Sequence, residues 1–189
     1  MSFAWLPNGL CVLRILLAAP TAYALYTGRY ELTLLLFAIA AISDGLDGWL
    51  AKHFGWSTRL GKILDPIADK ILLVTVFVTL VWIGLVPIWL AVAAVLRDVI
   101  IVLGAASYTL FIGHVEGHPT RVSKLNTLLQ LCFGLGVIAD AAWDLMAPAF
   151  LMTLGAATFV TTVVSGLDYI LTYARDAVRD RRAALAGIR

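Results

Sequence analysis

The chain has 189 residues, of which 61% are hydrophobic and only 14% are charged. Soluble domains carry about 25% charged residues, and a fold this short cannot bury so many apolar side chains. The composition therefore excludes an ordinary soluble domain and predicts a protein whose surface faces lipid. The formal net charge of +2 is too small to favour nucleic acid as a partner.

Six apolar segments are each long enough, at about 20 residues, to cross the hydrocarbon core of a bilayer as a helix. Turn-forming residues such as Gly28, Gly84 and Pro119 stand between them. We therefore predict an all-α polytopic membrane protein, with six transmembrane helices in one bundle that forms a single domain over residues 1–189. The predicted segments are 8–27, 31–53, 62–83, 88–112, 122–142 and 147–174.

Lysine and arginine are distributed unevenly between the two sides that six spans would create. Both termini and the connections after the second and fourth segments share one side, and that side carries nearly all the cations. The opposite side carries only Arg29. The positive-inside rule therefore predicts that both termini are cytoplasmic, with residues 175–189 as a basic cytoplasmic tail.

Four aspartates crowd the end of the second segment and the start of the third. Asp44 and Asp47 are three residues apart, and Asp65 and Asp69 are four apart, so each pair lies on one face of its helix. The two helices are consecutive and joined by a short connection, which predicts antiparallel neighbours. We expect the four carboxylates to form one cluster at the cytoplasmic end of the bundle.

Four carboxylates this close cannot all stay ionised without compensation. They can be protonated, they can pair with Lys52, Lys62 or Lys70 in a structural cluster, or they can bind a divalent cation. Oxygen ligands without His or Cys favour Mg²⁺ or Mn²⁺, which commonly completes its shell with substrate phosphates. Gly48 and Gly61 flank the acids, where they permit a ligand or another helix to approach closely. The pattern favours phosphoryl chemistry.

The stretch from Asp44 to Asp69 reads D-x2-D-G-x2-A-K-x8-G-x3-D-x3-D. It resembles the signature of the CDP-alcohol phosphatidyltransferases, D-x2-D-G-x2-A-R-x8-G-x3-D-x3-D, with Lys52 in place of the usual Arg. Lysine keeps the cation but lacks the planar fork that binds phosphate through two nitrogens. The resemblance implies a six-helix membrane protein that forms a homodimer. It also implies an active site that faces the cytoplasm, in our expectation from a bacterial inner membrane.

The resemblance also implies a role for each matching position. Members of the family transfer the phosphatidyl group of CDP-diacylglycerol to an alcohol and release CMP, with two divalent ions, Mg²⁺ or Mn²⁺. Asp69 would be the general base that accepts the proton of the acceptor hydroxyl. The implied metal ligands are Asp44, Asp47, Asp65 and Asp69, and the implied CDP-binding residues are Asp47, Gly48, Lys52, Gly61 and Asp65.

Charged residues in the fourth and fifth segments bear on the identity of the acceptor. Arg97 and Asp98 lie inside the fourth segment, where an ionisable group either forms an ion pair or has a function. Arg97, Arg121 and Lys124 could bind a phosphate carried by the acceptor, and Arg14 in the first segment is a further candidate. An acceptor with its own phosphate is either phosphatidylglycerol or glycerol 3-phosphate.

The Arg97-Asp98 pair and the run P-T-x-x-S-K-x-N-T-x-x-Q over residues 119–130 resemble the CMP-forming cardiolipin synthases. Phosphatidylglycerophosphate synthases usually show R-E followed by a further Arg, where this chain has Leu103 and Gly104. The resemblance therefore favours phosphatidylglycerol, with glycerol 3-phosphate as the alternative acceptor.

Two other classes of membrane protein also carry acidic motifs. Intramembrane prenyltransferases place theirs on distant helices of longer chains, whereas both pairs here fall within residues 44–69. A small cation carrier is the non-enzymatic alternative, but carriers usually show internal repeats with broken helices, and the sequence shows no such repeat. Metal-dependent release of CMP would exclude both classes.

Overall fold

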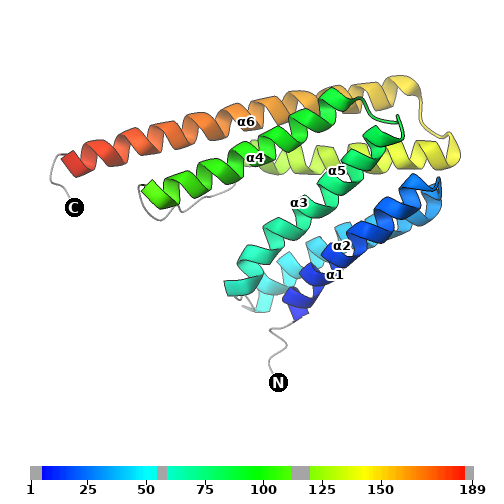
Figure 1. The fold of residues 1–189 in the computed structure, drawn as a ribbon, viewed down its shortest axis with the longest axis horizontal. Coiled ribbons are helices and arrows are strands. Elements are labelled where there is room, and N and C mark those ends of the chain that lie inside the picture. The colour runs from blue at the N-terminus through cyan, green and yellow to red at the C-terminus, as the bar shows by residue number, and fades with distance from the viewer. Residues whose placement is uncertain (1–5, 55–58, 112–119, 186–189) are drawn as a thin grey trace. The chain divides into compact units, whose positions relative to one another are not determined.

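The computed structural model describes residues 6–54, 59–111 and 120–185, and these residues form helices joined by turns, without a strand (Figure 1). The helix bounds agree with the predicted segments to within three residues, except that α6 continues well beyond the predicted end at residue 174. The prediction of an all-α protein is therefore confirmed. The helices are α1 Leu6–Tyr26, α2 Tyr30–Phe54, α3 Arg59–Trp82, α4 Ile88–Phe111, α5 Arg121–Trp143 and α6 Pro148–Leu185.

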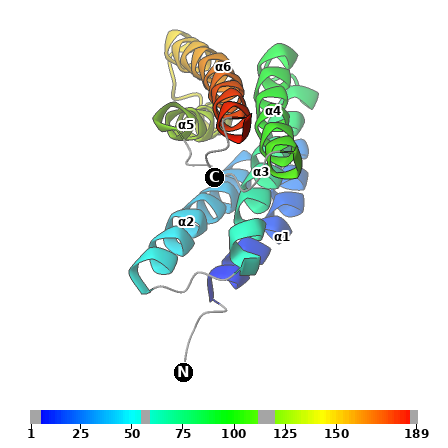
Figure 2. The same ribbon diagram turned by 90° about the vertical axis from the view of Figure 1, so that its left-hand side faces the viewer.

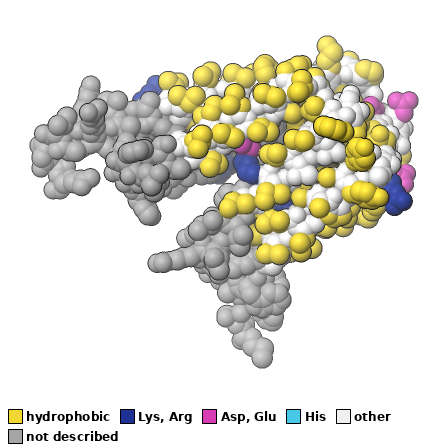
Figure 3. Space-filling model, in the orientation of Figure 1, with side chains coloured by type: hydrophobic (Ala, Val, Ile, Leu, Met, Phe, Trp, Pro, Cys, Tyr) yellow, Lys and Arg dark blue, Asp and Glu magenta, His cyan; other side chains and the backbone are white. Residues whose placement is uncertain are grey.

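The helices have the length and the surface that a bilayer requires. Helix α1, the shortest, has 21 residues and spans ~32 Å, against a hydrocarbon core of about 30 Å. Among the described residues, three stretches are long and apolar enough to cross it: Gly9–Tyr26, Val122–Trp143 and Pro148–Thr172. Large apolar side chains such as Leu16 and Met152 are exposed, and hydrophobic side chains spread over the described surface (Figure 3).

These features make the protein an integral membrane protein. They confirm the first, fifth and sixth predicted segments as candidate spans. Membrane crossing by the second, third and fourth segments stays a prediction.

The chain divides into two compact units. The first unit comprises Met1–Ala91 and Leu131–Leu151, and the second unit comprises Val92–Gln130 and Met152–Arg189. The single domain expected from the sequence stays a prediction.

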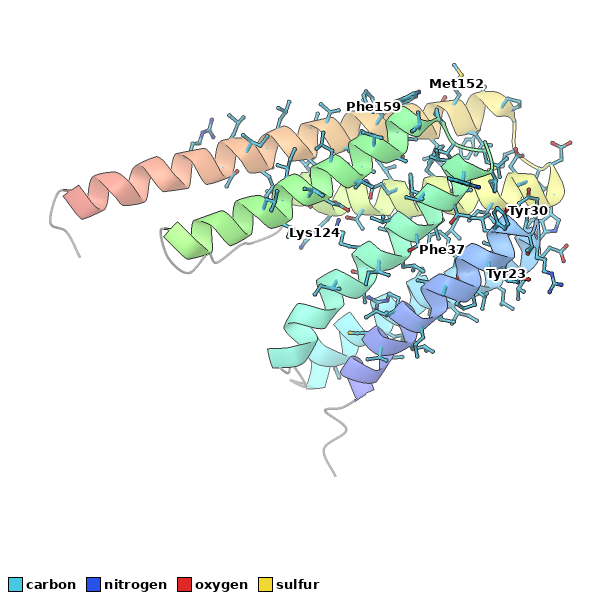
Figure 4. The ribbon with its side chains drawn as sticks, viewed as in Figure 1. Tyr23, Tyr30, Phe37, Lys124, Met152 and Phe159 are labelled. Carbon is cyan, nitrogen blue, oxygen red and sulfur yellow. The ribbon has the colours of Figure 1, made fainter. Side chains whose placement is uncertain are left out.

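In the first unit, α1 packs against both α2 and α3 (Figure 2). Phe37 of α2 is fully buried and is labelled in Figure 4. A Cβ atom on Gly134 of α5 would lie 3.4 Å from the Phe37 ring, so the absence of a side chain there allows close packing. The rings of Phe77 and Phe133 extend the same core at a centroid distance of 6.2 Å.

The turns after α1, α3 and α5 lie at the same end of the first unit (Figure 1). Gly28 and Gly84 close two helices with positive φ angles of 74° and 81°, a conformation that glycine adopts without strain. At the same end, Trp143 Nε1 donates a hydrogen bond to Glu31 Oε1 at 3.1 Å. Exposed aromatic side chains, including Tyr23 near Tyr30 (Figure 4), suit a membrane–water interface.

The second unit has a buried polar seam between α5 and α6. Asn126 Oδ1 accepts hydrogen bonds from the hydroxyls of Thr161 at 3.0 Å and Thr162 at 2.8 Å. Gln130 reaches the Thr162 hydroxyl one helical turn further along. Hydrogen bonds of this kind hold helices together inside a membrane, where no water competes for them.

Candidate active site

The acidic motif occupies the two helix ends that meet at the connection between α2 and α3. These helices run in opposite directions within the first unit (Figures 1 and 2). Asp47 and Asp65 lie ~10 Å and ~9 Å along their helices from this connection, and Asp44 and Asp69 each lie ~15 Å from it. The four aspartates therefore lie at similar distances from the ends of their two helices, and their gathering into one cluster stays a prediction.

Of the residues predicted to bind metal or CDP, Asp69 is the one whose side chain the structure describes. Its side chain is 32% exposed, so it is partly accessible from outside the protein. The side chains of the other predicted metal ligands and CDP-binding residues lie outside the described residues. Those residues are Asp44, Asp47, Gly48, Lys52, Gly61 and Asp65.

Arg14 of α1 forms an ion pair with Asp69, in which guanidinium Nη1 donates a hydrogen bond to carboxylate Oδ1. The Arg14 side chain is 1% exposed, and Cys11 and Ala18 on the same face of α1 are also buried. A charge in such an apolar stripe requires a partner. The packing of α1 on α3 brings this partner from a position 55 residues away.

A second charged site lies in the second unit, where three helices meet at Arg97. Its Nη1 donates to Asp98 Oδ1 at 2.7 Å, and its Nε and Nη2 donate to the Ser165 hydroxyl at 3.2 and 2.8 Å. Nη2 also contacts the hydroxyl of Ser123. The guanidinium carbon lies 5.9 Å from the centre of the Tyr169 ring. Arg97 thus connects α4, α5 and α6 and is only 4% exposed.

The sequence left open whether Arg97 binds a phosphate or forms an ion pair, and the structure shows the ion pair with Asp98. A role in binding the acceptor stays a prediction. Lys124, the next predicted phosphate ligand, is exposed near the start of α5 (Figure 4). Arg121 begins α5, and its side chain lies outside the described residues.

The donor set of the acidic motif fits a hard divalent cation. The motif consists of carboxylates alone, and the one described side chain, Asp69, is partly exposed. Among the described residues, no three His, Cys, Asp or Glu side chains come together as a metal site. Three of the four predicted ligands, Asp44, Asp47 and Asp65, belong to the part of the chain whose side chains are not described.

The sequence indicates Arg14 only as a candidate phosphate ligand and does not predict its contact with Asp69. The available signal was energetic. An arginine inside the first apolar segment needs a buried anion, and the acidic motif supplies candidates on the two helices that follow.

Comparison with known proteins gives one family. The family model described as CDP-alcohol phosphatidyltransferase matches residues 4–164. A probable CMP-forming cardiolipin synthase of Drosophila melanogaster is 32% identical over 184 residues, which cover 88% of this chain and 56% of that protein. The human CMP-forming cardiolipin synthase is 29% identical, over 87% of this chain and 60% of its own length.

A probable phosphatidylglycerophosphate synthase of Mycobacterium tuberculosis is 30% identical over 187 residues, covering 95% of this chain and 86% of that protein. The chain therefore spans a little over half the length of the two cardiolipin synthases and most of the length of the mycobacterial protein.

Proposed function

The chain belongs to the CDP-alcohol phosphatidyltransferase family of enzymes, and we propose that it transfers the phosphatidyl group of CDP-diacylglycerol to an alcohol and releases CMP. The observation that carries this proposal is the acidic motif at one end of the first unit, with the partly exposed side chain of Asp69 inside it. The family match over residues 4–164 supports the same reaction class.

The residues of the motif divide the chemistry between them. The acceptor oxygen forms a bond to the phosphorus that bears the diacylglycerol, and the bond from that phosphorus to the oxygen of CMP breaks. Asp69 accepts the proton of the attacking hydroxyl, a contribution of about 10²–10⁴-fold to the rate. Gly48, Lys52 and Gly61 line the site for the cytidine diphosphate portion, together with Asp47 and Asp65.

Asp44, Asp47 and Asp65 would hold two divalent ions, Mg²⁺ or Mn²⁺, with Asp69 close to them. Such ions, when bound, neutralise the diphosphate and the charge that develops on the departing CMP. A purely protein site would have to supply the same positive charge from Lys52 and its neighbours.

For the acceptor we propose phosphatidylglycerol, which would make the product cardiolipin. The R-D pair at Arg97 and the run from Pro119 to Gln130 support this choice, as does the similarity to the cardiolipin synthases of Drosophila and human. Arg97, Arg121 and Lys124 would bind the phosphate of the acceptor. Glycerol 3-phosphate is the second candidate, because the mycobacterial phosphatidylglycerophosphate synthase matches with comparable identity over a greater share of its length.

We further propose that the six helices all cross the membrane and that the motif faces the cytoplasm. The aromatic side chains and the single Arg29 at the opposite end of the first unit support this orientation. We also expect a homodimer in a bacterial inner membrane, with residues 175–189 as a basic tail on the cytoplasmic side.

The test uses the purified full chain in liposomes with CDP-diacylglycerol, Mg²⁺ or Mn²⁺, and either acceptor. We expect CMP and cardiolipin with phosphatidylglycerol, no product after chelation by EDTA, and a loss of about 10²–10⁴-fold in Asp69→Asn. The matched control is Asp144→Asn, because Asp144 is exposed at the opposite end of the unit and asparagine tolerates its φ of 52°.

Each alternative outcome separates one part of the proposal from the rest. Product only with glycerol 3-phosphate would keep the reaction class and replace the acceptor. Full activity in Asp69→Asn would remove the general base from the proposal. No CMP with either acceptor and either metal would contradict the proposed reaction and favour a cation carrier.

A further inference from the structure

Arg14 is the largest fully buried side chain among the described residues, and it lies outside the acidic motif. It lies on one buried face of α1, together with Cys11, Ala18 and Leu25. These neighbours are small or apolar, and Thr21 on the same face donates its hydroxyl hydrogen bond to a backbone carbonyl of α1. One of its partners is the Asp69 carboxylate. The one charge of this face, Arg14, therefore contacts the proposed general base.

Stability alone does not explain an arginine at this position. A buried ion pair contributes little compared with a well-packed apolar pair of similar volume, because both charges must leave water. A leucine at position 14 would match the lining of this face. The guanidinium is therefore better explained by what it does to Asp69.

The geometry shows what it can do. An aspartate carboxylate turns easily about its last torsion, whereas a guanidinium is planar and rigid. Arg14 is held by buried neighbours and donates to Oδ1, while 32% of the Asp69 side chain stays exposed. The contact fixes one carboxylate oxygen from the buried side, while part of the Asp69 side chain stays exposed.

We propose that Arg14 is a positioning residue, which holds the Asp69 carboxylate in the orientation that accepts the proton of the acceptor hydroxyl. This inference rests on the proposed function of Asp69. A general base must lie about 2.6–3.2 Å from the oxygen that it deprotonates, so a rotated carboxylate loses most of its effect. Because Arg14 contacts Asp69, its proposed role is to orient that carboxylate and not to bind the acceptor phosphate.

The test measures kcat and KM for CDP-diacylglycerol and for phosphatidylglycerol, or for glycerol 3-phosphate if that is the acceptor used. In Arg14→Gln we expect kcat to fall about 10–100-fold, the usual loss when a group that orients a reacting residue is removed. Both KM values should stay within about threefold of the parent. Arg14→Lys keeps the cation and should recover part of the lost kcat.

A double variant separates positioning from a merely structural role. If Arg14 acts through Asp69, Arg14→Gln should cause no further loss of kcat in an Asp69→Asn background. A structural role would lower the activity by the same factor in both backgrounds. The matched control is Arg29→Gln, an exposed arginine near the other end of α1, which should leave kcat unchanged.

Three results would overturn the inference: an unchanged kcat in Arg14→Gln, a rise in the acceptor KM at constant kcat, or equal losses in the two backgrounds. If Arg14→Gln does not fold in detergent, Arg14→Lys is assayed in both backgrounds and the same comparison decides. Full activity of Asp69→Asn would instead refute the proposed function of Asp69. Loss in Asp69→Asn with none in Arg14→Gln would refute only the positioning role.

Discussion

The contacts of Arg97 predict how strongly it holds the second unit together. The guanidinium has three hydrogen-bonded partners on three helices: Asp98, Ser123 and Ser165. Polar contacts between membrane helices contribute about 0.6–1.7 kcal/mol each, so the loss of the two interhelical contacts, to Ser123 and Ser165, amounts to about 1–3 kcal/mol. We expect Arg97→Leu to lower the free energy of unfolding by this amount. Leucine is the appropriate replacement because it keeps the Cβ and Cγ atoms of the arginine stem, which lie beside Gly166.

The assay is reversible unfolding of the purified protein in mixed micelles, followed by circular dichroism. Arg97→Leu combined with Asp98→Leu should be less destabilised than Arg97→Leu alone, because the double variant removes the buried anion together with its cation. Lys124→Leu serves as the control: it removes an exposed cation from the same unit and should change stability by no more than about 0.5 kcal/mol. An Arg97→Leu protein as stable as the parent, with a raised KM for the acceptor, would refute the interhelical role.

Two further predictions concern packing and topology. Gly134→Ala should be tolerated, since its Cβ would meet the Phe37 ring at 3.4 Å, whereas Gly134→Leu should cost about 1–3 kcal/mol through overpacking in the same unfolding assay. For topology, a membrane-impermeant maleimide added to intact cells should label Asp144→Cys and should label Ser57→Cys only after permeabilisation. The reverse pattern would contradict a cytoplasmic motif, and the unmodified chain serves as the labelling control.

The helix positions followed from the sequence because hydropathy and turn residues carry the same information there. Gly28 and Gly84 end α1 and α3 in the structure just where the apolar runs stop. The C-terminal end of α6 did not follow, since the apolar run ends near Thr172 while the helix continues to Leu185. Hydropathy reports where lipid contact ends, and a charged helix can extend beyond that point.

The charge partners could be predicted only in part. Asp69 belongs to a local motif and was found by spacing, but its contact with Arg14 joins residues 55 positions apart. Arg97 and Asp98 are adjacent, and neighbouring residues on a helix point in directions about 100° apart, so spacing does not predict their ion pair. The long arginine side chain bridges that angle and reaches Ser165 of α6 as well.

The two buried arginines, Arg14 and Arg97, differ in the exposure of the residues that they contact. Asp69, the partner of Arg14, stays accessible, so the influence of Arg14 extends to a group that can meet substrate. Arg97 is enclosed by Asp98, Ser123 and Ser165, and a phosphate could reach it only by displacing one of them. Among the described residues predicted to bind the acceptor phosphate, Lys124 alone presents an exposed cation. The acceptor phosphate is therefore to be sought first at Lys124, where Lys124→Gln should raise the acceptor KM without lowering stability.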